Sequence, residues 1–179
     1  IIQTNLIEKL RYGENPHQES AIYSKNKTLN IKQLSGKKLS FNNYNDIFSS
    51  LLISKSLPKN TGTVIVKHAN PSGVSINKDK IKSFKQALNC DPISAFGGIV
   101  CCNFKINKKL ATELNKTFFE VIIGNKIDKD AIKILKKRKN LRIIDALEST
   151  SKDTQSVISN FDNFLIQTND DSFFFKKKF

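Results

Sequence analysis

Helical and extended sequence patterns alternate four times between residues 41 and 144, and this alternation constrains the fold more than any other feature. Each stretch of apolar residues at helical spacing is followed by a short apolar run of the kind found in buried strands. These runs are TVIV at 63–66, IVCC at 99–102, EVII at 120–123 and LRII at 141–144. Strands that alternate with helices predict an α/β fold, in which flanking helices cover a mostly parallel sheet and sites lie at strand ends.

The apolar positions also locate the four helices. The first helix is predicted by Tyr44, Ile47, Phe48, Leu51 and Leu52 and has about four turns, and the second is predicted by Ile81, Phe84 and Leu88. The third is predicted by Leu110, Ala111, Leu114 and Phe118. The fourth is predicted by Ile132 and Leu135, with Asp128 as a cap. Residues 148–163 are polar and predict a loop before a last short strand at 164–166. The tail at 172–179 has no predicted partner element.

The composition excludes several classes of protein. A chain of 179 residues that is 39% apolar and 26% charged is neither disordered nor collagen-like, and its size predicts one core. It has neither an apolar run near the roughly 20 residues of a membrane-spanning helix nor a signal peptide, so we expect a cytoplasmic protein without membrane partners. Three cysteines, two of them adjacent, predict reduced thiols. Because the chain begins with Ile1 and contains no Met, we interpret it as a fragment or a processed piece.

The charge is strongly positive, with 30 Lys and Arg against 16 Asp and Glu and a net charge of +14. Such an excess favours anionic partners in general. The basic residues are mostly Lys spread along the chain, with clusters only at 136–139 and 176–178, and no interleaving of Arg with aromatic residues suggests a base-stacking platform. We therefore interpret the charge as a solvated surface, and expect no specific nucleic-acid partner.

The strongest local signal for chemistry is VKHANPSG at 66–73. A buried strand that ends in Lys67 and His68 and then breaks into a turn places a cation and an imidazole together. Histidine exchanges protons near neutral pH, and the ammonium can stabilise developing negative charge. The alternative is a structural histidine that is bonded to the backbone of the turn.

Two further motifs indicate binding more weakly. In RYGENPHQ at 11–18, Arg11 and Tyr12 are suited to holding a phosphate or a planar heterocycle, and the alternative is a loop against the core. In DPISAFGG at 91–98, the glycines let backbone N–H groups approach a ligand, although a tight turn before a strand has the same pattern.

A metal site and the common nucleotide loops are not supported. His17 and Glu19 match half of a zinc deaminase signature, but the P-C-x-x-C half is absent, and Cys101 and Cys102 would face opposite sides of a strand. The chain contains neither G-x-x-x-x-G-K-S/T nor G-x-G-x-x-G. We predict no metal ligands in this region.

Four motifs taken together resemble one family, the 5-aminoimidazole-4-carboxamide ribonucleotide (AICAR) transformylase domain of the bifunctional AICAR transformylase/IMP cyclohydrolase proteins. They are LRYGENPHQ at 10–18, GKKLSFNNYND at 36–46, VIVKHANPSG at 64–73 and DPISAFGGIV at 91–100, and FFEVIIG at 118–124 continues the likeness. The order and spacing match, and the likeness covers roughly residues 6–170.

The resemblance implies transfer of a formyl group from the co-substrate 10-formyltetrahydrofolate to the 5-amino group of AICAR, which gives FAICAR on the route to inosine monophosphate (IMP). It implies that His68 takes the amine proton and that Lys67 stabilises the transition state. The residues that it implies for nucleotide binding are Arg11, Tyr12, Asn43, Phe96, Gly97 and Glu120. A weakly nucleophilic aromatic amine needs such a positioned base and cation.

The resemblance also implies a cytidine-deaminase-like fold without zinc, in a domain built from two related halves. Residues 1–171 resemble the N-terminal half, whereas residues 172–179 match nothing that we can place. The second half, which would supply the folate contacts, and the cyclohydrolase domain lie outside the likeness. Ser72 stands where many members have Cys, with little consequence expected. Because the family forms its sites across a subunit interface, the resemblance implies a homodimer for the complete protein.

Three hypotheses follow. The first is the leading one, that the chain is half of an AICAR transformylase and is active only when completed. The second keeps the family but makes the chain a folded, inactive, truncated fragment. The third hypothesis is that the chain is a polyanion-binding protein whose function depends on its positive charge. It leaves the motifs around Lys67 and His68 without an explanation.

Overall fold

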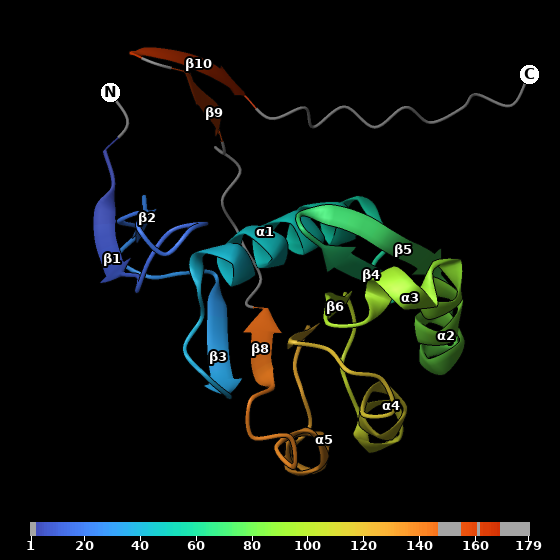
Figure 1. Cartoon of the computed structure of the whole chain (residues 1–179). Helices are drawn as coiled ribbons and strands as arrows, with labels where there is room; N and C mark the ends of the chain where they lie inside the picture. The colour runs from blue at the N-terminus through green and yellow to red at the C-terminus, as the bar shows by residue number, and fades with distance from the viewer. Residues whose placement is uncertain (1–2, 147–154, 161, 169–179) are drawn as a thin grey trace, which may run out of the picture. The chain divides into compact units, whose positions relative to one another are not determined.

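The computed structural model describes residues 3–146, 155–160 and 162–168, and internal contacts divide the chain into two units, 1–148 and 149–179. Each unit is described by itself. The first contains a six-stranded sheet with flanking helices (Figure 1), as expected for an α/β fold. In spatial order its strands are β3 (Ile31–Ser35), β8 (Arg142–Ala146), β7 (Val121–Gly124), β6 (Ile99–Cys102), β4 (Gly62–Lys67) and β5 (Asn70–Ile76).

The expectation of a mostly parallel sheet is wrong, because the sheet is mixed. β7 is parallel to both β6 and β8, whereas β4 is antiparallel to both β5 and β6, and β3 is antiparallel to β8. The cause is a hairpin. Because β4 turns directly into β5, β5 runs in the direction of β6, β7 and β8, and β4 lies reversed between β5 and β6.

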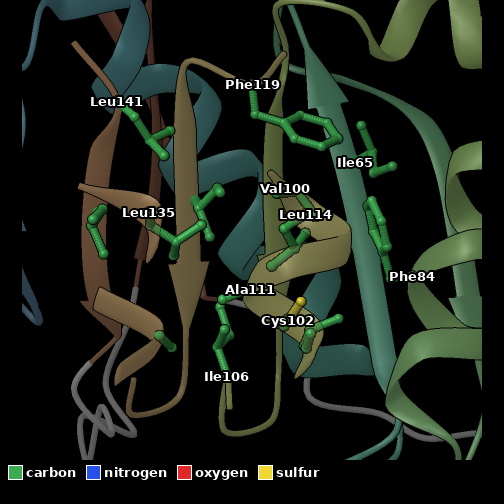
Figure 2. Packing of buried hydrophobic residues seen from close by; sticks show 14 of the residues in the cluster. Ile65, Phe84, Val100, Cys102, Ile106, Ala111, Leu114, Phe119, Leu135 and Leu141 are labelled. Atoms are coloured by element: carbon green, nitrogen blue, oxygen red, sulfur yellow. The ribbon is translucent and has the colours of Figure 1, made fainter. Parts of the chain in front are cut away.

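Both faces of the sheet are covered, and side chains alternate between them along each strand. Val64 and Val66 pack on the face covered by α1 (Phe41–Ser56), and Ile65 packs on the face covered by α2 (Lys80–Cys90), α4 (Lys108–Leu114) and α5 (Lys129–Leu135). On the face covered by α2, α4 and α5, Phe84 and Leu114 are fully buried in a cluster of apolar side chains (Figure 2). Burial on both faces explains why the strand runs are continuously apolar.

Most helix boundaries follow the predictions, and three features differ. α1 has 16 residues and begins with a reciprocal capping box between Ser40 and Asn43. α4 ends at Leu114, so the predicted extension to Phe118 is wrong. Asp128 is the N-cap residue of α5 but makes no capping hydrogen bond, and one of its carboxylate oxygens pairs with Lys105 at 2.7 Å. The turn predicted at 91–98 contains a short helix, α3 (Pro92–Ala95).

Two further pairs of strands complete the described residues. β1 (Asn5–Lys9) pairs with β2 (Ala21–Ser24), and Ile22 from β2 joins the cluster under α1. In the second unit, β9 (Gln155–Asn160) pairs with β10 (Asn163–Thr168). The strand predicted at 164–166 is therefore confirmed, whereas the loop predicted over 155–160 is wrong. The predicted tail at 172–179 lies outside the described residues.

All three cysteine thiols are free, as expected, and their environments differ. Cys101 and Cys102 are each 1% exposed and pack on opposite faces of the sheet, whereas Cys90 is exposed. Burial raises the pKa of the Cys101 thiol to about 11, and burial together with the neighbouring Cys101 raises the pKa of Cys102 further. Both buried thiols are therefore protonated at neutral pH.

These environments predict selective alkylation. Because the thiolate is the nucleophile, a raised pKa and burial both slow the reaction. At pH 8, iodoacetamide should label Cys90 in the native 179-residue chain, and should label Cys101 and Cys102 only after denaturation. Peptide mass spectrometry measures each site. Equal labelling of all three thiols in the native protein would contradict the burial of β6.

Candidate active site at the end of β4

The site begins where β4 turns into β5. Lys67 ends β4, and His68 and Ala69 form a two-residue turn before Asn70 opens β5. Their φ angles, 53° and 59°, are both left-handed, which suits the twist of a hairpin. Because neither residue is glycine, this conformation costs about 1–2 kcal/mol per residue. The sequence predicted a turn after His68, whereas the turn is formed by His68 and Ala69, and the residues that follow belong to β5. Pro71 is accommodated because β5 is an edge strand.

Three hydrogen bonds fix the turn and the lysine beside it. The Ala69 N–H donates to Asp46 Oδ1 at 2.7 Å, and Asn70 Nδ2 donates to the His68 carbonyl at 2.9 Å. Lys67 Nζ donates to the Phe96 carbonyl at 2.9 Å. An ammonium has three N–H donors, so this bond leaves Lys67 able to bind a further oxygen.

Lys67 and His68 line a hollow of about 440 Å³. Its other lining residues come from β5 and from the start of α3, and they are Asn70, Pro71, Ser72, Asp91 and Ser94. The Asp91 carboxylate caps α3 by accepting the Ser94 N–H at 2.9 Å. Hydrogen bonds from Ser94 lower the pKa of Asp91, so this carboxyl group is ionised at neutral pH.

The strand register brings other predicted residues to the same edge of the sheet. Val66 pairs with Ile99, and Ile99 with Val121, so the residues before β6 and β7 lie beside the end of β4. The backbone N–H of Glu120 donates to the Gly98 carbonyl at 3.0 Å. Glycine at position 98 lets this segment lie close to the end of β4, because a Cβ there would be 2.8 Å from the Val66 carbonyl oxygen.

The Glu120 carboxylate is held from two sides. Asn43 Nδ2 donates to Glu120 Oε2 at 3.2 Å, and Arg142 Nη1 lies 3.7 Å from the same oxygen. Gly97 has a left-handed φ of 75°, and its N–H donates to the Phe118 carbonyl. The Phe96 and Phe118 rings, with centroids 5.2 Å apart, are exposed beside it. The edge thus offers a carboxylate, a cation, an imidazole and aromatic surface.

The structure links six of the eight predicted residues at one edge of the sheet, whereas Arg11 and Tyr12 lie in the segment between β1 and β2. Hydrogen bonds and register link Lys67, His68, Asn43, Phe96, Gly97 and Glu120 at one edge. Arg11 lines a different hollow of about 640 Å³ next to β1 and β2, which shares no lining residue with the first. Its guanidinium carbon lies 5.6 Å from the centre of the Tyr12 ring, a cation–π contact.

Two residues of this edge escaped the sequence analysis. Asp46 follows Asn43 by three residues, a spacing that places both residues on one face of α1 and that could have identified Asp46 from the sequence. Arg142 begins β8 next to Val121, and nothing in its sequence context marked it.

Across the residues that the structure describes, no group of three His, Cys, Asp or Glu side chains is arranged to hold a metal ion. In the same part of the chain, no helix combines the length and apolar character needed to cross a membrane.

Comparison with known sequences now assigns the family. The family model described as AICARFT/IMPCHase bienzyme matches residues 1–179, so the chain belongs to this family of bifunctional purine biosynthesis proteins. The resemblance found in the motifs is confirmed.

Similar relatives are named bifunctional purine biosynthesis protein PurH. That of Caldicellulosiruptor saccharolyticus is 40% identical over 148 residues, which is 79% of this chain and 29% of the relative. That of Prochlorococcus marinus is 43% identical over 150 residues, 78% of this chain and 29% of the relative. That of Caulobacter vibrioides is 38% identical and covers 96% of this chain and 34% of the relative. The chain thus spans about a third of the length of these relatives.

Proposed function

We propose that this chain carries the acid–base and charge-stabilising residues of a formyltransferase. The enzyme would move the formyl group of 10-formyltetrahydrofolate to the 5-amino group of AICAR and give FAICAR, on the route to IMP. The observation that carries the proposal is the juxtaposition of Lys67 and His68 at the end of buried β4, facing a hollow, with Glu120 at the same edge of the sheet.

The proposed step is an acyl transfer between two nitrogens. The lone pair of the AICAR amine attacks the formyl carbon, and a C–N bond forms while negative charge gathers on the formyl oxygen. The bond from that carbon to N10 of the folate then breaks. The amine gives one proton to His68, and N10 gains one proton as it leaves, so the protons balance. Lys67 stabilises the charged oxygen through an N–H that its bond to Phe96 leaves available.

The remaining residues are proposed to hold the nucleotide. The carboxylate of Glu120, fixed by Asn43, is an acceptor for N–H groups of AICAR, and Gly97 with the Phe96 ring offers backbone and aromatic contact to the heterocycle. Arg11 and Tyr12 form the second binding group, and a guanidinium fork suits a phosphate. We propose that the nucleotide reaches both groups.

The proposal places the remaining parts of the site outside this chain. The relatives are about three times as long, and we propose that the further sequence supplies the folate contacts and that the complete protein is a homodimer. The family, rather than the net charge of +14, accounts for the arrangement around Lys67 and His68. Several lysines are paired with acidic side chains instead, such as Lys105 with Asp128 and Lys116 with Glu113.

The experiment that tests the function is formyl transfer with AICAR and 10-formyltetrahydrofolate. It is run on the 179-residue chain alone and on the chain extended by its natural downstream sequence or by a relative's second half. We expect turnover only in the extended protein. Turnover by the 179 residues alone would contradict the two-half account. No turnover by either folded protein would favour the inactive fragment. Binding to nucleic acid that stays specific at physiological salt would favour the polyanion hypothesis.

A further inference from the structure

The carboxylate of Asp46 supports the backbone immediately after the proposed base. Asp46 Oδ1 accepts the Ala69 N–H at 2.7 Å, and Ala69 follows His68 in the turn. The bond joins two segments that are distant in sequence, because Asp46 belongs to the second turn of α1 whereas Ala69 connects β4 to β5. Its short length and charged acceptor place it among the stronger hydrogen bonds of proteins.

The turn needs such support. His68 and Ala69 both have left-handed φ angles, and the residues that favour this conformation in two-residue hairpin turns are Asn, Asp and Gly. Strained backbone of this kind persists only where the surrounding structure determines it, and it is concentrated at functional sites. His68 lines the hollow together with Lys67, and if the turn relaxed, the Cα–Cβ bond of His68 would point in another direction relative to that hollow.

The element that carries Asp46 is well anchored and serves the rest of the site as well. The first turn of α1 is fixed by the Ser40–Asn43 capping box, and Ile47, next to Asp46, is fully buried against the sheet. Asn43, one helical turn before Asp46, donates to the Glu120 carboxylate. One face of α1 thus holds both the histidine turn and the proposed nucleotide carboxylate, so their separation is set by a rigid helix.

We propose that Asp46 is a positioning residue, which holds the His68-Ala69 turn left-handed and so aims the His68 imidazole at the reacting amine. This inference rests on the proposed formyl transfer. Asp46 acts through the backbone of Ala69 and touches neither substrate. Its removal should therefore slow the chemical step and leave binding of the nucleotide almost unchanged.

The first test is kinetic and uses the extended protein. Asp46→Ala removes the acceptor and should lower kcat about 10- to 100-fold, the range expected for a misplaced catalytic group, while KM for AICAR changes less than about threefold. Asp46→Asn keeps an acceptor oxygen and should retain most of kcat. The matched control is Asp130→Ala on α5, which removes an exposed carboxylate paired with Lys133 and should leave kcat unchanged.

A rescue variant separates positioning from a general loss of structure. Ala69→Gly removes the Cβ that disfavours the left-handed conformation, so the double variant Asp46→Ala with Ala69→Gly should regain a large part of the lost kcat. Failure of the rescue, or an Asp46→Ala variant with the kcat of the unmodified protein, would overturn the inference.

The second readout does not depend on activity. In the 179-residue chain, hydrogen exchange of the Ala69 amide, followed by NMR, should be at least about tenfold faster in Asp46→Ala than in the unmodified chain, because the protecting acceptor is lost. Unchanged exchange would refute the role of Asp46 in the turn. Absence of formyl transfer by the unmodified extended protein would instead refute the proposed function, and the exchange result would still decide whether Asp46 holds the turn.

Discussion

Replacing His68 by alanine in the extended protein should abolish measurable formyl transfer while AICAR still binds. A positioned general base contributes about 10²- to 10⁴-fold to rate, and the other histidine of the chain, His17, lines a different hollow. The nucleotide contacts proposed for Glu120 and Asn43 do not involve His68, so the AICAR dissociation constant should change by less than about threefold. Steady-state kinetics and calorimetric titration measure the two quantities.

Asparagine at position 68 makes this test sharper. Alanine could lower activity simply by relaxing the turn, whereas asparagine tolerates the left-handed region and offers no base. His68→Asn should therefore be as inactive as His68→Ala and should keep the thermal stability of the unmodified chain. Substantial turnover by His68→Asn would remove His68 from the mechanism and return it to the structural role considered from the sequence.

The second large effect concerns stability and falls on Gly73. A Cβ at this position in β5 would lie 1.9 Å from the backbone carbonyl oxygen of Ala87 in α2. Because the obstructing atom is backbone, the whole helix must move away from the hairpin. We expect Gly73→Ala to lower the free energy of unfolding by about 3 kcal/mol, the upper part of the range for overpacking, and Tm by about 6–12 °C.

The matched control for this variant is Gly13→Ala. The nearest atoms that its Cβ would meet belong to the Gln18 side chain, at 3.0 Å and beyond, so a shift of a few tenths of an ångström relieves the contact and the loss in stability should be much smaller. Thermal unfolding of the 179-residue chain, followed by circular dichroism, compares the two. Equal Tm values for Gly73→Ala and the unmodified chain would show that α2 does not lie against β5 as described.

The sequence predicted those parts of the fold whose residues are buried on both sides. β4, β6 and β7 have unbroken apolar runs because helices cover each face of the sheet, and such runs can be recognised in the sequence alone. β5 was missed for the opposite reason. It is an edge strand with Pro71 and Gly73 inside it, and both residues argue against a strand when only the sequence is considered. The direction of β4 in the sheet, and with it the mixed topology, depended on that missed hairpin.

The residues of the candidate site also divide into those predicted from the sequence and those found only in the structure. The strand-end pattern pointed to Lys67 and His68, and the resemblance added Glu120, but only the strand register explains why residues so far apart in sequence meet at one edge. The turn at His68-Ala69 contains none of the residues that usually mark a two-residue hairpin, so its position could not be predicted. Asp46 has a helical spacing to Asn43 that could have drawn attention to it, whereas the contact of Arg142 with Glu120 requires the alignment of β7 with β8.

The most direct test of the account is the position of AICAR in a crystal structure of the extended protein. The decisive quantity is the distance from the 5-amino nitrogen of bound AICAR to the nearer ring nitrogen of His68. The account predicts hydrogen-bond reach, about 2.6–3.2 Å or one bridging water, with Glu120 and Lys67 at the same edge of the ligand. AICAR bound with its amine beyond the reach of His68, even through a water, would contradict the assignment of His68 as the base.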